Sequence, residues 1–310
     1  MVGLSSHNTL TLPDGRRLGY AEYGRAQGFP IVYLHGVPGS RLSGLLAGVL
    51  AAPRGARVIA IDRPGYGLSD PQPGRRIIDW PADVRVVADA LGLDRFALLG
   101  HSGGGPFAAA CAYVLAERIT GVALVSSMGP VTTTEAMRRM TGRQKLFRLA
   151  AAHIRPAMEF TLSRDADRLL NDAHAYLTGR VARIPPVDAE VLRRPTIRAM
   201  TQEDLVEAYA QGARAVADDV RLLARPWGFP LAGIRAHVDV WHGELDPVVP
   251  AWLGRQVAAA IPGAHAHIAR NAGHLMLIDW MDEILDTLVA GTRGHPSRGP
   301  ASARVPAGVG

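Results

Sequence analysis

The sequence predicts an α/β protein: a mostly parallel, twisted sheet with helices on both faces and an inserted group of helices. Short, uniformly apolar segments alternate with segments of helical spacing, a pattern typical of a parallel sheet that is covered on both sides. The alternation stops near residue 129, gives way to helical patterns alone, and resumes near residue 229. Hydrophobic residues make up 48% of the chain and charged residues 20%, which is ordinary for a globular domain.

The first two strands are predicted to form an antiparallel hairpin. Residues 9–12 and 17–23 flank Pro13, Asp14 and Gly15, whose types favour a tight turn. The apolar runs that follow are too short for helices, and each precedes a stretch with helical spacing. The predicted parallel strands are residues 31–34, 58–61, 96–99, 122–125, 238–241 and 265–269, and the predicted helices of the core are 42–51, 81–91, 106–115, 251–260 and 275–290.

The chain is expected to divide into three parts. An α/β core takes residues 1–128 and 229–290, and a helical insertion takes residues 129–228. Within the insertion, residues 134–152 and 201–223 are each predicted to be helical. Residues 291–310 are rich in Gly, Pro and Ser and lack periodicity, so they are predicted to be a disordered tail.

Composition and charge exclude several classes of partner. The formal net charge is +6, but the arginines occur as scattered pairs and Lys145 is the single lysine, so no nucleic-acid partner is predicted. No apolar stretch approaches the ~20 residues that a membrane helix needs, so no membrane association is predicted. The first residues lack the pattern of an export signal, and Cys111 is the only cysteine. We therefore expect a cytoplasmic protein; nothing in the sequence specifies an oligomeric state.

The pattern with the clearest chemical meaning is GHSGG at residues 100–104. It follows the predicted strand 96–99 and precedes a predicted helix, which is the context of a G-x-S-x-G nucleophile elbow. In such a tight turn a Cβ two positions to either side of the serine would clash, and Gly100 and Gly104 meet that demand. The amides at the start of the next helix would face the negative charge that develops there. Ser102 is therefore the candidate nucleophile.

A serine hydroxyl needs a base and an orienting acid, and the expected chain order is serine, acid, histidine. Asp246 follows the predicted strand 238–241, and His274 follows the predicted strand 265–269. Active-site residues of open α/β sheets gather beyond the carboxyl ends of the strands. Asp246 and His274 are therefore predicted to converge with Ser102 at one edge of the sheet.

Other residues compete for these roles. Glu244 lies two positions from Asp246, but the shorter side chain suits the turn, and Asp246 with Pro247 is expected to open the next helix. Four further histidines are expected to pack near the site, to face solvent or to satisfy a backbone group: His101, His242, His265 and His267.

The oxyanion hole is predicted from the backbone N–H groups of two loops. Residues 35–40 (HGVPGS) follow a predicted strand and can turn N–H groups inward, so the donors are predicted to be the N–H groups of Val37 and Gly103. His35 is expected to fix this loop by hydrogen bonds. Residues 62–69 (DRPGYGLS) are predicted to be a structural turn.

Taken in order, these motifs resemble the α/β-hydrolase fold superfamily over residues 8–290, approximately. The resemblance implies Ser102 as nucleophile, His274 as base and Asp246 as its acid, in agreement with the assignment from the residues alone. It also implies that residues 129–228 form a cap that lies over the nucleophile and shapes the substrate pocket. The matching motifs are HG-x-PG at 35–39, D-R-PG-x-G-x-S at 62–69, GHSGG at 100–104, HG-x-x-DPVVP at 242–250 and GH at 273–274.

The expected chemistry is transfer of an acyl group from a small-molecule substrate to water. No metal and no other cofactor is expected, because no Cys/His or carboxylate cluster has metal-ligand spacing. A carboxylic ester of a mainly apolar molecule is the expected substrate, since few acids or bases are clearly placed in the insertion. The alternatives are a thioesterase, a carbon–carbon bond hydrolase, an aminopeptidase, a cofactor-free haloperoxidase, and a small-molecule receptor with the same three residues intact.

Overall fold

The computed structural model describes residues 5–293 and contains one eight-stranded sheet in the order β1-β2-β4-β3-β5-β6-β7-β8. β2 pairs with β1 and with β4 in antiparallel fashion, and the other neighbouring strands pair in parallel. The predicted fold class, a mostly parallel sheet, is therefore confirmed. The strands are β1 (Ser5–Thr11), β2 (Arg17–Gly24), β3 (Phe29–Leu34), β4 (Ala56–Ile61), β5 (Phe96–His101), β6 (Ile119–Val125), β7 (Val238–Gly243) and β8 (His265–Ala269).

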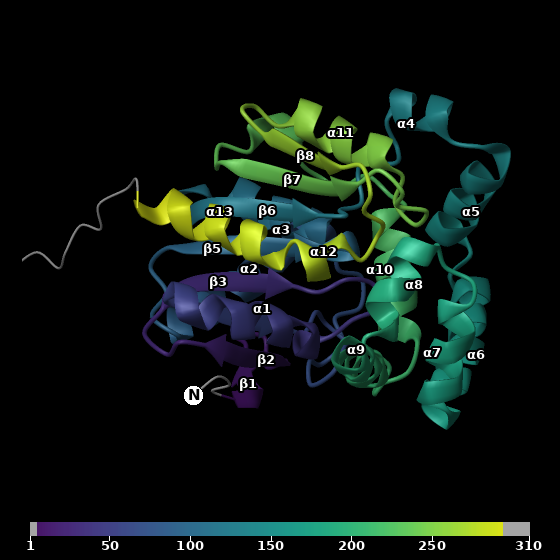
Figure 1. Ribbon diagram of the computed structural model, residues 1–310, viewed down its shortest axis with the longest axis horizontal. Helices are drawn as coiled ribbons and strands as arrows, with labels where there is room; N and C mark the ends of the chain where they lie inside the picture. Colours follow the sequence, from purple (N-terminus) through teal and green to yellow (C-terminus); the bar gives the residue numbers. More distant parts are fainter. Residues whose placement is uncertain (1–4, 294–310) are drawn as a thin grey trace, which may run out of the picture.

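Helices cover both faces of the sheet, because successive side chains of each strand point to opposite faces and both sets are apolar (Figure 1). In β3, Ile31 and Tyr33 belong to one buried apolar cluster, whereas Val32 and Leu34 belong to the other. One face carries α1 (Leu45–Ala51), α12 (Met276–Asp279) and α13 (Met281–Arg293), and the other carries α2 (Trp80–Ala90), α3 (Gly105–Val114) and α11 (Ala251–Ala260).

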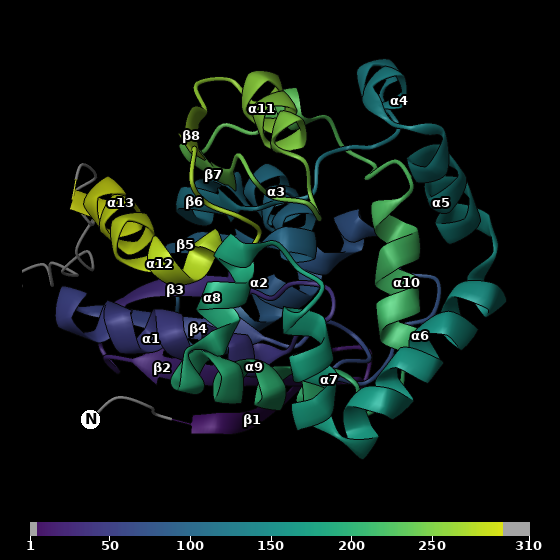
Figure 2. The same cartoon turned by 45° about the vertical axis from the view of Figure 1, so that its right-hand side comes forward.

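The inserted helices, α4–α10, follow β6 in the chain and lie beyond the carboxyl ends of the parallel strands (Figures 1 and 2). Each of the two long helices predicted here is split. A new helix starts after Thr141, whose side chain accepts the N–H of Gln144 in a capping box. Gly212, with a φ of +85°, separates the other pair. The inserted helices are α4 (Thr134–Arg139), α5 (Gly142–His153), α6 (Arg155–Asn171), α7 (Ala173–Val181), α8 (Pro186–Arg193), α9 (Pro195–Ala208) and α10 (Arg214–Leu223).

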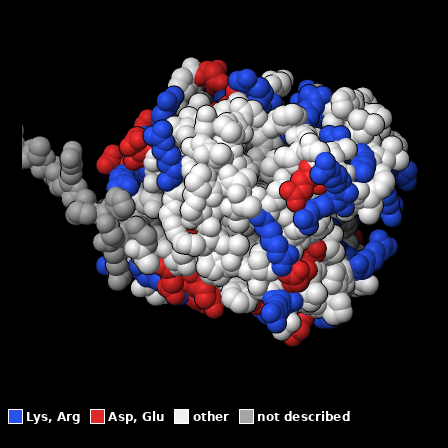
Figure 3. Space-filling model, turned by 90° about the horizontal axis from the view of Figure 1, so that it is seen from above, with Lys and Arg blue, Asp and Glu red and all other residues white. Residues whose placement is uncertain are grey.

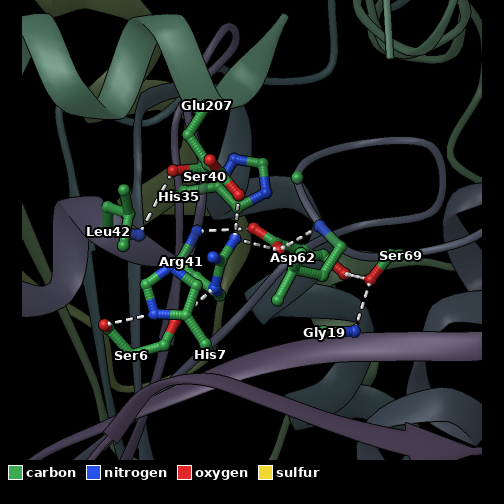
Figure 4. Close-up of polar contacts among 12 residues, drawn as sticks. Ser6, His7, Gly19, His35, Ser40, Arg41, Leu42, Asp62, Ser69 and Glu207 are labelled. Atoms are coloured by element: carbon green, nitrogen blue, oxygen red, sulfur yellow. Dashed lines mark hydrogen bonds and ion pairs between the residues drawn. The ribbon is translucent and has the colours of Figure 1, made fainter. Parts of the chain in front are cut away.

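A buried arginine attaches α9 to the loops of the core (Figure 4). Arg41 follows β3 and donates from Nη1 to Asp62 at 2.9 Å and to Glu207 of α9 at 2.5 Å. The Asp62 carboxylate also accepts the backbone N–H groups of Arg41 and Leu68, at 2.7 and 3.0 Å. Asp62 therefore organises the turn after β4 and, through Arg41, ties that turn to an inserted helix.

A second buried group of charges attaches α10. Asp219 of α10 accepts from Arg63 Nε at 2.8 Å and from Arg75 at 2.6 Å, and the side chains of Asp219 and Arg63 are fully buried. Burial opposes ionisation of Asp219, but the two guanidinium groups outweigh it and hold the pKa of the carboxyl below its ordinary value. The inserted helices are thus joined to the core by ion pairs as well as by apolar packing.

On the face shown in Figure 3, acidic and basic side chains are interspersed around a broad uncharged area, and no continuous band of one sign crosses it. None of the helices within residues 5–293 has both the length and the apolar character required to cross a bilayer. The predicted tail begins too early, because α13 continues to Arg293; residues 294–310 lie outside the described residues.

Candidate active site

Ser102 sits in a strained turn between β5 and α3. Its φ is +51°, in the left-handed region that residues with a side chain rarely adopt. The two flanking glycines allow this turn: a Cβ at Gly104 would lie 2.2 Å from the carbonyl oxygen of Leu34, and a Cβ at Gly100 would lie 2.7 Å from Cβ of Ala108. Each separation is shorter than any van der Waals contact, so both positions require glycine, as the steric argument from the sequence expects.

The structure brings Ser102, Asp246 and His274 into one chain of hydrogen bonds. His274 lies in the loop after β8, and its Nε2 is 3.0 Å from Oγ of Ser102. Its Nδ1 is 2.7 Å from Oδ2 of Asp246, which lies in the loop after β7. An ionised carboxylate can only accept, so Nδ1 carries the ring proton and donates it to Asp246. Nε2 is then left to accept the hydroxyl hydrogen of Ser102.

Asp246 is held by its own loop. Its Oδ1 accepts the backbone N–H groups of Val248 and Val249, each at 2.8 Å. Burial opposes ionisation, but hydrogen bonds with His242 and His274 and with the loop N–H outweigh it, and they hold the pKa of Asp246 below its ordinary value. The expectation that Asp246 opens the next helix is wrong: the carboxylate closes a turn, and α11 begins only at residue 251.

Two other histidines lie beside these residues. His242 is fully buried and donates from Nε2 to the carbonyl oxygen of Val249 at 2.7 Å. The His101 ring lies 5.6 Å from the His274 ring, centroid to centroid. Burial, reinforced by the nearby imidazole of His274, lowers the pKa of His101 to about 3, so this ring stays neutral near pH 7. Neither His242 nor His101 hydrogen-bonds to Ser102.

The remaining competitors lie away from Ser102. Glu244 is exposed and forms an ion pair with Arg255 on the surface. His265 and His267 face Asp239 near the amino ends of β7 and β8, at the opposite end of the strands from Ser102. None of these side chains is part of the hydrogen-bonded group at Ser102.

The loop that carries Val37 lies against the elbow, and hydrogen bonds to its carbonyl oxygens hold it in place. A Cβ at Gly103 would lie 2.5 Å from Cγ2 of Val37, so the two loops are in contact. Arg63 donates to the carbonyl oxygens of His35 and Gly36, at 2.5 and 2.7 Å. The Gly36 carbonyl and the Val37 N–H belong to one planar peptide and point in opposite directions. By holding the carbonyl, Arg63 sets the direction of the Val37 N–H.

His35 reinforces this arrangement. Burial, together with the charge of Arg63, keeps the pKa of His35 well below its ordinary value, so the ring is neutral. Nε2 accepts the backbone N–H of Arg63 at 3.2 Å, and Nδ1 donates to the Gly36 carbonyl at 2.9 Å. Within residues 5–293, neither the Val37 N–H nor the Gly103 N–H donates a loop or turn hydrogen bond to another backbone group.

Asp188 of α8 is a neighbour of the site that sequence reasoning missed. Its carboxylate, which is 3% exposed, accepts the backbone N–H groups of His274 at 3.1 Å and Leu275 at 2.8 Å. A Cβ at Gly273 would lie 2.4 Å from the same carboxylate. An inserted helix therefore holds the loop that carries His274. The sequence holds no signal for this contact, because 86 residues separate the partners.

A cavity of about 390 Å³ lies between the elbow and the inserted helices. Ser102 and His274 form part of its wall, and the loop of Val37 forms another part. Most of the remaining wall is apolar. The apolar side chains from α6, α8 and α9 and from the segment that begins at Leu275 include Leu162, Leu192, Ile197, Leu205, Leu275 and Ile278.

The family profile described as alpha/beta hydrolase fold matches residues 30–279, which include Ser102, Asp246 and His274. The chain belongs to this family. The resemblance identified from the sequence motifs is therefore confirmed.

Individual relatives of this α/β hydrolase differ in activity. A non-heme chloroperoxidase from Streptomyces lividans is 37% identical over 125 residues, which cover 40% of this chain; the chain spans less than half of that protein, at 45%. A 2-hydroxymuconate semialdehyde hydrolase from Pseudomonas putida is 26% identical over 261 residues, covering 82% of this chain and 84% of the relative. The solved structure of an esterase from Exiguobacterium antarcticum has a TM-score of 0.67 at 22% identity, covering 93% of this chain and 99% of that chain. This last likeness is one of fold.

The cavity of this α/β-hydrolase-fold protein contains more ionisable groups than the sequence predicts. Asp165, Arg180 and Asp204 line it in addition to Asp188. Asp165 accepts the Tyr176 hydroxyl at 2.7 Å. Burial raises the pKa of Asp204 to about 7. Two hydrogen bonds from Ser40, one from its N–H and one from its hydroxyl, oppose this rise. Since Asp188 and Asp165 already accept hydrogen bonds from protein groups, the wall offers a substrate fewer free charges than its composition suggests.

Proposed function

We propose that this protein is a serine hydrolase that cleaves a carboxylic ester, or a related acyl bond, of a small and mainly apolar substrate. The observation that carries the proposal is the hydrogen-bonded chain Ser102–His274–Asp246 at the wall of a largely apolar cavity. Residues 129–228 act as the cap over this cavity. The substrate carbonyl would lie beside Ser102, with its apolar parts against the inserted helices.

In the proposed mechanism, His274 removes the hydroxyl proton as Ser102 Oγ attacks the carbonyl carbon. Asp246 keeps the ring in the tautomer that can accept this proton and stabilises the imidazolium that forms. When the tetrahedral intermediate collapses, His274 returns the proton to the leaving alcohol and an acyl-enzyme remains. Water then attacks the acyl-enzyme with His274 again as base, which releases the acid and restores the serine.

The N–H groups of Val37 and Gly103 form the proposed oxyanion hole. The Val37 N–H points away from the Gly36 carbonyl that Arg63 holds, and the Gly103 N–H stands in the first turn after the elbow. Backbone donors fixed before the reaction stabilise the developing oxyanion without reorganisation, and one such donor contributes about 10²–10³-fold to the rate.

The proposal is tested with a panel of substrates and a covalent probe. We expect turnover of p-nitrophenyl acetate, butyrate and octanoate, and slower or no turnover of a matched thioester and p-nitroanilide. A fluorophosphonate should add to a single residue, Ser102, when the digested protein is examined by mass spectrometry. Rapid labelling of Ser102 without turnover of any panel member would favour the receptor alternative, and labelling elsewhere would contradict the proposed nucleophile.

Asp188→Ala is expected to lower kcat by about 10–100-fold with a smaller effect on KM, because the loop of His274 loses its anchor. Asp188→Asn keeps an accepting oxygen and should recover part of the loss. The readout is steady-state kinetics on a p-nitrophenyl ester, with Glu190→Ala, an exposed acid on the same helix, as the matched control. Equal kcat values for Asp188→Ala and Glu190→Ala would show that the anchor does not position His274.

A further inference from the structure

A cluster of histidines surrounds one buried carboxylate near the amino ends of β7 and β8. β8 is an edge strand, and the register of the two strands places Asp239 opposite His265 and Trp241 opposite His267. His237 directly precedes β7, and its ring lies beside the Asp239 carboxylate. This face of the sheet is shared with α13, and the cluster is far from the carboxyl strand ends that carry the residues of the active site.

The distances within the cluster are short. Nε2 of His237 lies 3.0 Å from Oδ2 of Asp239, and Nδ1 of His265 lies 3.9 Å from Oδ1. The three possible ligand atoms of these residues all lie within 4.8 Å of one another. The ring centroids of His237 and His265 are 5.0 Å apart. Ligand atoms around a tetrahedral Zn²⁺ are about 3.3 Å apart, so rotations of the two exposed imidazoles bring all three into range.

The carboxylate is buried, and its ion-pair and hydrogen-bond partners among the described side chains are imidazoles. The Asp239 side chain is 4% exposed, whereas those of His237 and His265 are 47% and 67% exposed. Within residues 5–293, no arginine or lysine forms an ion pair with Asp239. A buried carboxylate attracts a cation, and the two exposed imidazoles leave an open path to it from solvent.

We propose that His237, Asp239 and His265 form a binding site for one divalent transition-metal ion of the Zn²⁺ class. Two imidazole nitrogens and one carboxylate oxygen suit Zn²⁺, Co²⁺, Ni²⁺ and Cu²⁺ rather than Mg²⁺ or Ca²⁺, and they leave a fourth position for water. In the structure Nε2 of His237 faces Oδ2 of Asp239. On binding, that ring places its proton on Nδ1 and presents the Nε2 lone pair to the metal.

His267 supports the site without serving as a ligand. Its Nε2 donates to Oδ1 of Asp239 at 2.7 Å, and its ring stacks on Trp241 at 3.9 Å between centroids and 10° between planes. A ligating carboxylate is commonly oriented by such an outer hydrogen bond, which also leaves Oδ2 available to the metal. The metal would join residue 265 of the edge strand β8 to residues 237 and 239.

Spacing along the chain predicts no metal site here. The two parts of this cluster, residues 237–239 and 265–267, are 26 residues apart and are brought together only by the parallel pairing of β7 with β8. Each part alone is a common pattern for an exposed strand end. The site therefore becomes visible only with the register of the sheet.

The test uses full-length protein from which any affinity tag has been removed. Titration calorimetry with ZnCl₂ should give one bound ion per chain, and CoCl₂ should give the visible d–d absorption of low-coordinate Co²⁺. Zinc at about 100 times its dissociation constant should raise the melting temperature by about 4 °C, and EDTA should reverse the shift. His237→Ala and His265→Ala should each weaken binding tenfold or more, whereas His174→Ala, an exposed histidine on α7, should leave it unchanged.

Because these histidines are exposed, both variants are expected to fold, and the melting temperature of the metal-free variants checks this. His267→Ala should weaken binding less than either ligand variant, since it removes a support and no ligand. Absence of zinc binding by the parent protein would overturn the proposal. So would unchanged binding in the His237→Ala/His265→Ala double variant, because the ion would then occupy another site.

Discussion

Replacing the nucleophile, Ser102→Ala, lowers the rate of ester hydrolysis by about 10⁴–10⁶-fold and leaves the fold intact. The hydroxyl is the atom that forms the bond to the acyl carbon, and the cavity supplies no second nucleophile at the same position. Ser102 is 8% exposed, so removal of Oγ takes a polar atom out of a buried position, and no loss of stability is expected. The measurement is kcat/KM for p-nitrophenyl butyrate. Equal melting temperatures of parent and variant check that the fold is intact.

Two companion variants sharpen this result. His274→Ala alone should cost about as much as Ser102→Ala, and the double variant should lose little more, because the two residues act as one unit. Ser163→Ala, a serine of α6 outside the cavity wall, serves as the matched control and should retain full activity. A loss below tenfold in Ser102→Ala would mean that the hydrolysis comes from another group.

The second large effect concerns stability. Asp219→Ala is expected to lower the free energy of unfolding by about 3–5 kcal/mol, because it leaves the buried guanidinium groups of Arg63 and Arg75 without their shared partner. For a chain of this length the melting temperature should fall by roughly 5–8 °C. The measurement is thermal and urea unfolding followed by circular dichroism.

Asp219→Asn separates charge from shape in this experiment. The amide keeps the size of the side chain but removes the negative charge, so most of the loss should remain. The native pKa of Asp219 lies below its unfolded value, so its contribution is complete above about pH 4 and is lost as the pH falls further. The difference between parent and Asp219→Asn should therefore shrink in acid. Asp167→Ala, an exposed acid on α6, is the control; a loss below 1 kcal/mol for Asp219→Ala would refute the role assigned to the ion pairs.

The sequence predicted the features that depend on residues close together in the chain, namely the strands and the turn around Ser102. Alternation of apolar runs with helical spacing identified the parallel strands, and their order along the chain placed residues 102, 246 and 274 at one sheet edge. The glycines that flank Ser102 could be recognised because the steric demand of the turn acts within five residues.

What the sequence could not supply depends on contacts between distant segments. The breaks after Arg139 and near Gly212 interrupt patterns whose apolar spacing continues through them, so each pair of helices looked like one. Asp188 could not be connected to His274, nor Asp219 to Arg63, because nothing along the chain relates an acid in the insertion to a loop of the core. The number of acids in the cavity wall was underestimated for the same reason.

The charged groups that join α8, α9 and α10 to the core restrict how a small molecule can enter and leave the cavity. If these helices swung outward together, Asp188 would leave the backbone N–H groups that it accepts, and Glu207 would leave Arg41. Asp219 would leave Arg63 and Arg75 without a counter-charge. We therefore expect these helices to stay in place rather than open as a hinged lid. In that case the cavity of about 390 Å³ limits the size of the substrate that can react there.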